Sequence, residues 1–238
     1  MDALTPQEWT ALWLSLRIAG VATLAALPFA LAAALLLARG RFAGKALVDA
    51  VIHMPLVLPP VVTGYALLLL FGRKGPIGAF LADTFGIVFA FRWTGAALAC
   101  AVMGFPLMVR AIRLAIEAID PKLEAAAGTL GAHPVRIFFV VTLPLAAPGV
   151  LAGMVLCFAK ALGEFGATVT FVSNIPGETQ TLSSAIYAAI QDPAGDPMAL
   201  RLALVSVALS VLALIVSEAL ARRVQIFVGK GTPSTASG

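Results

Sequence analysis

Long apolar runs alternate along the chain with short polar stretches. A membrane-spanning helix needs about 20 mainly apolar residues, and five runs reach or approach that length. They cover residues 12–38, 51–71, 95–113, 145–172 and 200–220. A shorter run, 87–91, cannot span and is interpreted as a loop or a surface helix. The pattern predicts an all-α polytopic membrane protein with five transmembrane helices in a single domain, residues 1–220, followed by a tail, 221–238.

The composition excludes several classes of soluble protein. Of the 238 residues, 61% are hydrophobic and 12% are charged, and that charged share is about half of what a soluble domain carries. A soluble enzyme, a disordered chain and a disulfide scaffold are therefore excluded, and the net charge of +4 does not indicate nucleic-acid binding. Cys100 and Cys157 lie in apolar runs, where single cysteines are usually packing residues. His53 and His133 each lie near a proline, and no cluster has the spacing of a metal site.

Lysine and arginine residues concentrate on one side of the predicted bundle. Ten of them fall in the loop after the first span, in the segment between the third and fourth spans, and in the tail. The opposite side holds three, which are Arg73, Lys74 and Arg92. Because cytoplasmic loops carry the excess of Lys and Arg, the N-terminus is expected outside and the C-terminus inside. The acidic start, with Asp2 and Glu8, agrees with this orientation and argues against a cleaved signal peptide.

The segment between the third and fourth spans carries several helix starts and stops. Asp120-Pro121 is typical of an N-cap followed by the first helical residue. Gly131 supplies a stop, because glycine tolerates the left-handed conformation that ends many helices. Pro134 can begin a second short helix, which we expect to end at a break at Leu143-Pro144. Residues 120–137 thus predict two short cytoplasmic helices, and taken alone they could be an ordinary loop folded against its own chain.

Residues of this segment resemble the "EAA" signature of ABC importer permeases. Glu124-Ala125-Ala126 is followed by Gly131, and Leu143-Pro144 places the proline thirteen residues after that glycine, as in the family. Glu124 lies one residue further from the glycine than in the most common form. The resemblance implies the fold of a type I ABC importer permease, whose coupling helix docks into a groove on a cytoplasmic ABC ATPase dimer. The residues implied in this coupling are Glu124, Ala125, Ala126, Gly131, Ala132, Leu143 and Pro144.

Two further stretches narrow the resemblance. Residues 58–65, and residues 163–168 together with 173–179, look like the permease subunit of bacterial molybdate importers. This implies a homodimer in the cytoplasmic (inner) membrane that translocates molybdate delivered by a periplasmic molybdate-binding protein. Tungstate and sulfate or thiosulfate remain alternative substrates. An ATP-independent carrier or a membrane enzyme is less favoured, because Glu164 is the only central carboxylate and no internal repeat is visible.

Residues in the second and fourth spans are candidates for the pathway or its gate. They are Pro59, Pro60, Thr63, Tyr65, Lys160, Gly163, Glu164, Gly166 and Thr168. Prolines kink a helix, the two glycines allow close helix packing, and hydroxyls could contact an oxyanion or simply bond their own backbone. Lys160 and Glu164 are spaced to pair on one helix face. We expect a structural or gating ion pair ahead of a substrate ligand, because a carboxylate repels a dianion.

The chain shows no nucleotide site of its own. Residues 40–45 resemble a phosphate-binding loop, but three residues separate the glycines where four are needed, and Ala46 replaces the magnesium-binding hydroxyl. We therefore expect no cofactor on this chain and no bond chemistry, with ATP used by a separate ATPase. The expected partners are a second copy, that ATPase, the binding protein and membrane lipid.

Overall fold

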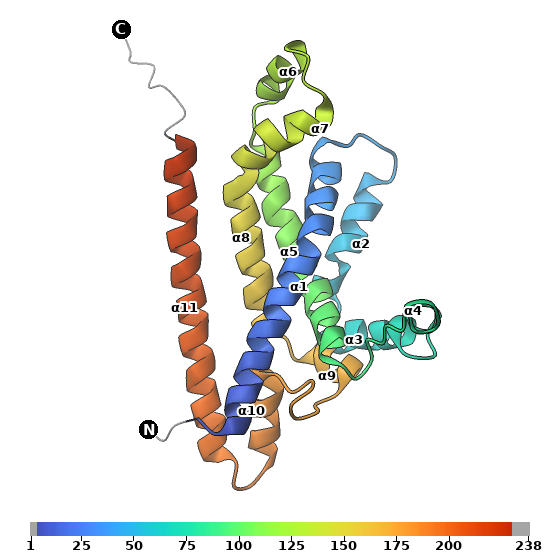
Figure 1. Ribbon diagram of the computed structural model, residues 1–238, viewed down its shortest axis with the longest axis vertical. Coiled ribbons are helices and arrows are strands. Elements are labelled where there is room, and N and C mark those ends of the chain that lie inside the picture. The colour runs from blue at the N-terminus through green and yellow to red at the C-terminus, as the bar shows by residue number, and fades with distance from the viewer. Residues whose placement is uncertain (1–3, 230–238) are drawn as a thin grey trace.

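The computed structural model describes residues 4–229, and the regular elements within them are all helical (Figure 1). In chain order they are α1 (Pro6–Arg39), α2 (Lys45–Val57), α3 (Pro60–Phe71), α4 (Pro76–Phe85), α5 (Trp93–Glu117), α6 (Pro121–Thr129), α7 (Pro134–Ile137), the π-helical turn η1 (Phe138–Thr142), α8 (Leu143–Leu162), α9 (Gly166–Val172), α10 (Leu182–Gln191) and α11 (Asp196–Gly229). The predicted tail lies outside the described residues from 230 onward, and α11 continues beyond the predicted end of the fifth span at residue 220.

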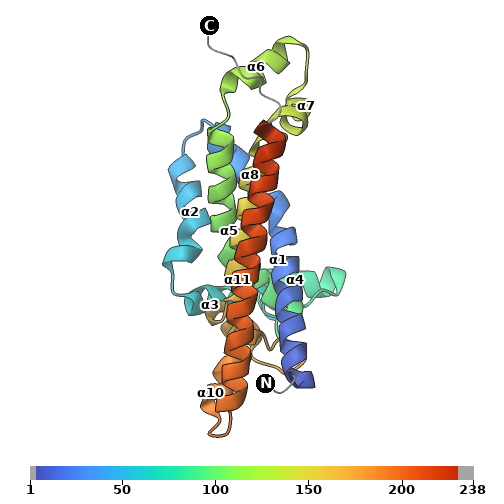
Figure 2. The same ribbon diagram turned by 90° about the vertical axis from the view of Figure 1, so that its left-hand side faces the viewer.

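Helices α1, α5 and α8 form the core of the bundle, with α11 alongside (Figures 1 and 2). Small side chains let these helices approach closely. A Cβ on Gly104 of α5 would lie 2.5 Å from the Sγ of Cys157 on α8. The α1 face in this core carries Ala19, Ala22, Ala30 and Ala34, each at most 1% exposed. Both cysteines are buried free thiols in the core, as the sequence predicts.

Polar groups of α1 find partners on neighbouring helices. Glu8 is fully buried and accepts hydrogen bonds from the guanidinium of Arg201 on α11, with an Nη2–Oε1 distance of 2.8 Å. The guanidinium of Arg17 lies 3.8 Å from the ring centroid of Trp93 at the start of α5. A cation over an aromatic face is stabilised by the ring quadrupole, so the one charge inside the predicted first span is accommodated.

The second predicted span is not one kinked helix. Helices α2 and α3 meet at a bend of 114°. Leu58 is extended, with ψ of 144°, and Pro59 and Pro60 follow it. A proline disfavours the helical conformation of the residue before it and lacks the N–H that would continue the ladder. The predicted kink therefore underestimates the change of direction, because the two prolines end one helix and start another.

The fourth predicted span, 145–172, is also wrong as a single helix. Helix α8 ends at Leu162, residues 163–165 are not helical, and α9 begins at Gly166. Four helical stretches within residues 4–229 are long and apolar enough to cross a membrane, and the bent pair of α2 and α3 would be a fifth. The predicted count of five thus depends on treating that pair as one broken span.

Different segments of the chain lie at the two ends of the bundle. The turn between α1 and α2, the α6–α7 segment and the C-terminal end of α11 lie together at one end, and the start of α1 lies at the other (Figures 1 and 2). The segments that the sequence analysis assigned to the cytoplasm therefore share one end. Residues 87–91 are not helical, and within the loop that follows α9 the structure adds α10, which the sequence analysis did not anticipate.

Candidate coupling element and gate

Helix α6 is capped at both ends by the residues that the sequence indicated. The Asp120 carboxylate accepts a hydrogen bond from the backbone N–H of Lys122 at 2.9 Å, and Pro121 is the first helical residue. Gly131, just beyond the helix, has φ of +82°. A Cβ there would meet no atom within 4 Å, so the requirement for glycine is conformational and not steric.

The predicted break at Leu143-Pro144 is wrong. Helix α7 begins at Pro134 as expected, but it passes through η1 into α8, so residues 134–162 are helical without interruption over 29 residues, and the path turns between α7 and α8 (Figure 1). The N–H of Leu143 bonds to the carbonyl of Phe138, five residues back. A π turn widens the helix by one residue, and Pro144, which has no N–H to donate, lies in the first turn of α8.

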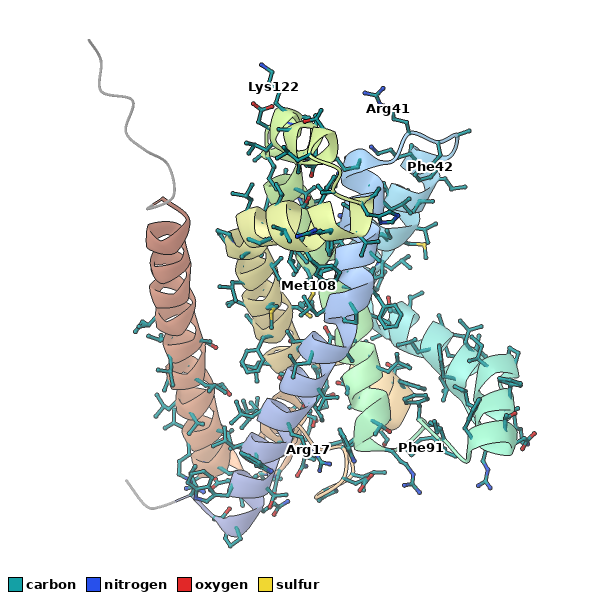
Figure 3. The ribbon with its side chains drawn as sticks, turned by 45° about the horizontal axis from the view of Figure 1, so that its top comes forward. Arg17, Arg41, Phe42, Phe91, Met108 and Lys122 are labelled. Carbon is teal, nitrogen blue, oxygen red and sulfur yellow. The ribbon has the colours of Figure 1, made fainter. Side chains whose placement is uncertain are left out.

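The α6–α7 segment, residues 120–137, presents apolar side chains to solvent beyond the ends of the long helices (Figure 3). Leu123 is 50% exposed, Leu130 is 88% exposed and Val135 is 59% exposed. Figure 3 shows Lys122 pointing outward from the tip of this segment. Ala125 and Ala126 are exposed as well, whereas Ala132 is half-buried. An exposed apolar group on a rigid element is typical of a protein-binding surface.

Glu124 faces into the protein and connects three elements. Its Oε1 accepts a hydrogen bond from the Thr142 hydroxyl at 2.8 Å and lies 3.2 Å from Nη2 of Arg39 at the end of α1. Arg39 Nη2 also contacts the carbonyl oxygen of Ile119 at 3.4 Å. Glu124 was predicted from the sequence, whereas Arg39 and Thr142 were not, because no local pattern indicates a contact between residues this far apart.

The break between α8 and α9 is organised by Glu164. This side chain is 1% exposed, and its Oε2 lies 2.5 Å from Nζ of Lys160. Its Oε1 accepts a hydrogen bond from the N–H of Ala167 at 2.9 Å, which caps the start of α9. The expected ion pair forms, although it spans the end of α8 and does not lie on one continuous helix.

Helices α3 and α9 cross at very short range. A Cβ on Gly166 would lie 2.8 Å from Cβ of Pro60, and a Cβ on Gly64 would lie 2.5 Å from the carbonyl oxygen of Ala167. The crossing brings together candidates from two predicted spans. The sequence analysis did not single out Gly64, although a glycine in an apolar helix is the usual signal of close backbone approach.

The remaining candidates of this region differ in their surroundings. The Thr63 hydroxyl is buried and makes no hydrogen bond with the described residues, whereas the Thr168 hydroxyl donates to the carbonyl of Phe165 at 2.9 Å. Pro59 and Tyr65 are exposed. Gly163 is exposed too, and a Cβ on it would approach only the Ala159 carbonyl, at 3.9 Å, so the expected close packing at Gly163 is not present within the described chain.

Comparison with known proteins shows which protein family this chain resembles. The family model described as "Binding-protein-dependent transport system inner membrane component" matches residues 26–226. The molybdenum transport system permease protein ModB of Escherichia coli K12 is 60% identical over 219 residues, which cover 92% of this chain and 96% of the relative. ModB of Haemophilus influenzae is 55% identical over 224 residues, covering 94% of this chain and 98% of the relative.

The fold matches a solved transporter of distant sequence. A bacterial alginate ABC transporter, solved in complex with an alginate pentasaccharide-bound periplasmic protein, superimposes with a TM-score of 0.72. The match covers 92% of this chain and 80% of that chain at 16% identity. This structural match supports the helical arrangement, and the family relationship rests on the sequence matches. The chain is therefore a multi-pass inner-membrane protein and belongs to the family of inner-membrane components of binding-protein-dependent transport systems.

Proposed function

We propose that this chain is the membrane-spanning permease subunit of an ATP-driven importer that translocates molybdate across the bacterial cytoplasmic membrane. The assignment of molybdate as the substrate rests on 60% sequence identity, over nearly the whole chain, to a molybdenum transport permease. The proposed mechanism rests on the capped α6–α7 segment, whose exposed apolar side chains extend beyond the spans. Such a segment can receive force from a cytoplasmic partner.

The partner at this segment is a cytoplasmic ABC ATPase dimer. Leu130, Leu123 and Val135 supply apolar contact area, and exposed Ala125 and Ala126 let a groove approach the backbone of α6 closely. The caps at Asp120 and Gly131 stiffen α6, so that the partner's motion moves the helix and does not unwind it. Docking here puts the C-terminus in the cytoplasm and the start of α1 outside.

Movement of the ATPase reaches the gate through α8. Residues 134–162 are helical without interruption, and the path turns from α7 into α8 (Figure 1). The 20 residues of α8 at 1.5 Å each extend about 30 Å. Helix α8 ends at the break that Glu164 and Lys160 organise, next to the α3–α9 crossing. ATP binding draws the two coupling segments together, and rigid-body rotation of the α8 helices opens the outer side.

Two copies of the chain enclose the pathway, with the α3–α9 crossings of both copies forming the gate. Lys160 neutralises Glu164, so that the carboxylate does not repel an arriving dianion. The Thr63 hydroxyl is buried and has no hydrogen-bond partner among the described residues, so it can donate to an oxyanion once opening of the gate uncovers it. A weak, transient contact suffices, because a periplasmic binding protein has already selected the substrate.

The test is ATPase activity in a reconstituted complex. The chain would be purified with its ATPase and placed in nanodiscs, with the molybdate-binding protein added either empty or loaded. The proposal predicts faster ATP hydrolysis with the loaded protein. Equal rates in both states, or failure to co-purify with an ATPase, would contradict it. Replacing molybdate by tungstate, sulfate or thiosulfate in uptake competition distinguishes the alternative substrates.

A further inference from the structure

We propose that Glu124 is an internal positioning residue that ties the coupling segment to α1 and α8, and that it does not contact the ATPase. The inference rests on the proposed function, because it concerns how α6 passes force to the spans. It starts from the two contacts of one atom, Oε1, with the Thr142 hydroxyl at 2.8 Å and with Arg39 Nη2 at 3.2 Å.

These contacts close the base of the coupling segment. The chain enters the segment through Ile119, whose carbonyl oxygen lies 3.4 Å from Arg39 Nη2. It leaves through η1, where Thr142 bonds to Glu124. Both connections are therefore joined at one point to the C-terminal end of α1. Apart from that point, α6 is held by its linkers at Asp120 and at residues 130–133 and by packing against α7 and η1.

Partial burial strengthens these contacts. The side chain of Glu124 is 23% exposed and that of Arg39 is 28% exposed, while Thr142 is almost fully buried. Hydrogen bonds to an ionised group are stronger than neutral ones, and partial burial reduces their screening by solvent. A fully exposed ion pair would contribute little.

The same geometry argues against a direct role of Glu124 at the partner surface. Its carboxylate faces Arg39 and Thr142, whereas Ala125 and Ala126, the next two residues, are exposed. Both internal contacts use Oε1 and hold the side chain against α1 and η1, on the inner side of α6. Glu124 therefore determines how rigidly α6 moves with α8, and the exposed residues determine whether the ATPase binds.

The test compares assembly with coupling in the reconstituted complex. Glu124→Ala and Arg39→Ala should each retain ATPase co-purification and keep basal hydrolysis within about twofold, whereas stimulation by the loaded binding protein falls about fivefold or more. The exchange variant R39E/E124R should recover part of the stimulation, because it restores an ion pair at the same place. Glu117→Gln is the matched control, because Glu117 pairs with Arg113 at the end of α5 and should leave stimulation unchanged.

Three outcomes would overturn the proposal. They are loss of ATPase binding in Glu124→Ala, unchanged stimulation in Arg39→Ala, or no recovery in the exchange variant despite normal membrane insertion. Glu124→Met keeps the side-chain length, removes both contacts of Oε1 and provides the same comparison if the alanine variant does not accumulate. The wild-type complex distinguishes failure of the proposed function from failure of this inference. Absence of stimulation in the wild-type complex contradicts the proposed function. Normal wild-type stimulation with unaffected variants contradicts only the internal role of Glu124.

Discussion

Gly64 lies at the tightest point of the α3–α9 crossing, and replacing it with alanine should separate the two helices. The added Cβ would lie 2.5 Å from the carbonyl oxygen of Ala167, 2.9 Å from the Ala167 Cα and 2.9 Å from the Thr170 Cβ. Two of these atoms are backbone, so rotation of a side chain cannot relieve the overlap. Helix α9 must move away from α3 by several tenths of an ångström or more.

The size of the effect follows from the geometry. Forcing extra volume into a packed site costs about 1–3 kcal/mol, and a helical Gly→Ala change returns up to about 1 kcal/mol through propensity. Because the overlap is with backbone, the cost lies in the upper part of that range, about 2–3 kcal/mol, so we expect Gly64→Ala to lose about 1–2 kcal/mol net, or about 2–8 °C in Tm for a chain of this size. Because the crossing is also the proposed gate, molybdate uptake should fall even where the protein remains folded.

Gly20→Ala is the matched control, because a Cβ on Gly20 in α1 would meet no atom within 4 Å. That variant should be as stable as the wild type or slightly more stable. Both variants would be compared by thermal unfolding in detergent and by uptake into proteoliposomes. Equal Tm values for the two variants, with normal uptake by Gly64→Ala, would refute the close crossing and its assigned role.

Three further predictions address other parts of the mechanism. Gly131→Val should strain the left-handed position by about 1–2 kcal/mol and reduce ATPase co-purification without affecting membrane insertion; full co-purification with normal uptake would count against the coupling role. Glu164→Gln should destabilise the protein by about 2 kcal/mol in thermal unfolding, which is below the range for a fully buried pair because Lys160 is 30% exposed. Adding Lys160→Met should recover part of that loss, and the absence of recovery would contradict the pairing. A cysteine at Thr5 should react with an impermeant thiol reagent from outside intact cells, and reaction only after permeabilisation would contradict the proposed orientation.

Local chemistry was the part of the fold that could be predicted from the sequence. The caps at Asp120 and Gly131 follow from hydrogen bonding and backbone conformation within a few residues, and the structure confirms both. The start of α7 at Pro134 is local in the same sense. These features need no knowledge of what packs against them.

Features that depend on tertiary contacts were predicted poorly. The prolines at 59 and 60 indicated a kink, but they do not specify the direction of α3 after the 114° bend, where it crosses α9 at short range. The expected break at Pro144 did not occur, because a π turn, invisible in the hydropathy pattern, carries the helix past it. The end of α8 at Leu162 was missed since the apolar run continues beyond it.

The candidate site shows the same division. Glu164 and Lys160 were found because they lie four residues apart in an apolar run, where charged groups are rare. Arg39 and Thr142 were missed as partners of Glu124, because only the folded chain brings the three together. Gly163 was assigned the close packing that Gly64 and Gly166 provide, and spacing alone could not separate them.

Molybdate uptake into proteoliposomes tests the central claim most directly. The chain would be reconstituted with its ATPase and the binding protein, and accumulation of radiolabelled molybdate would be measured with ATP, without ATP, and without the binding protein. We expect accumulation only when both ATP and the binding protein are present. Accumulation without ATP, or equal accumulation without the binding protein, would contradict that claim.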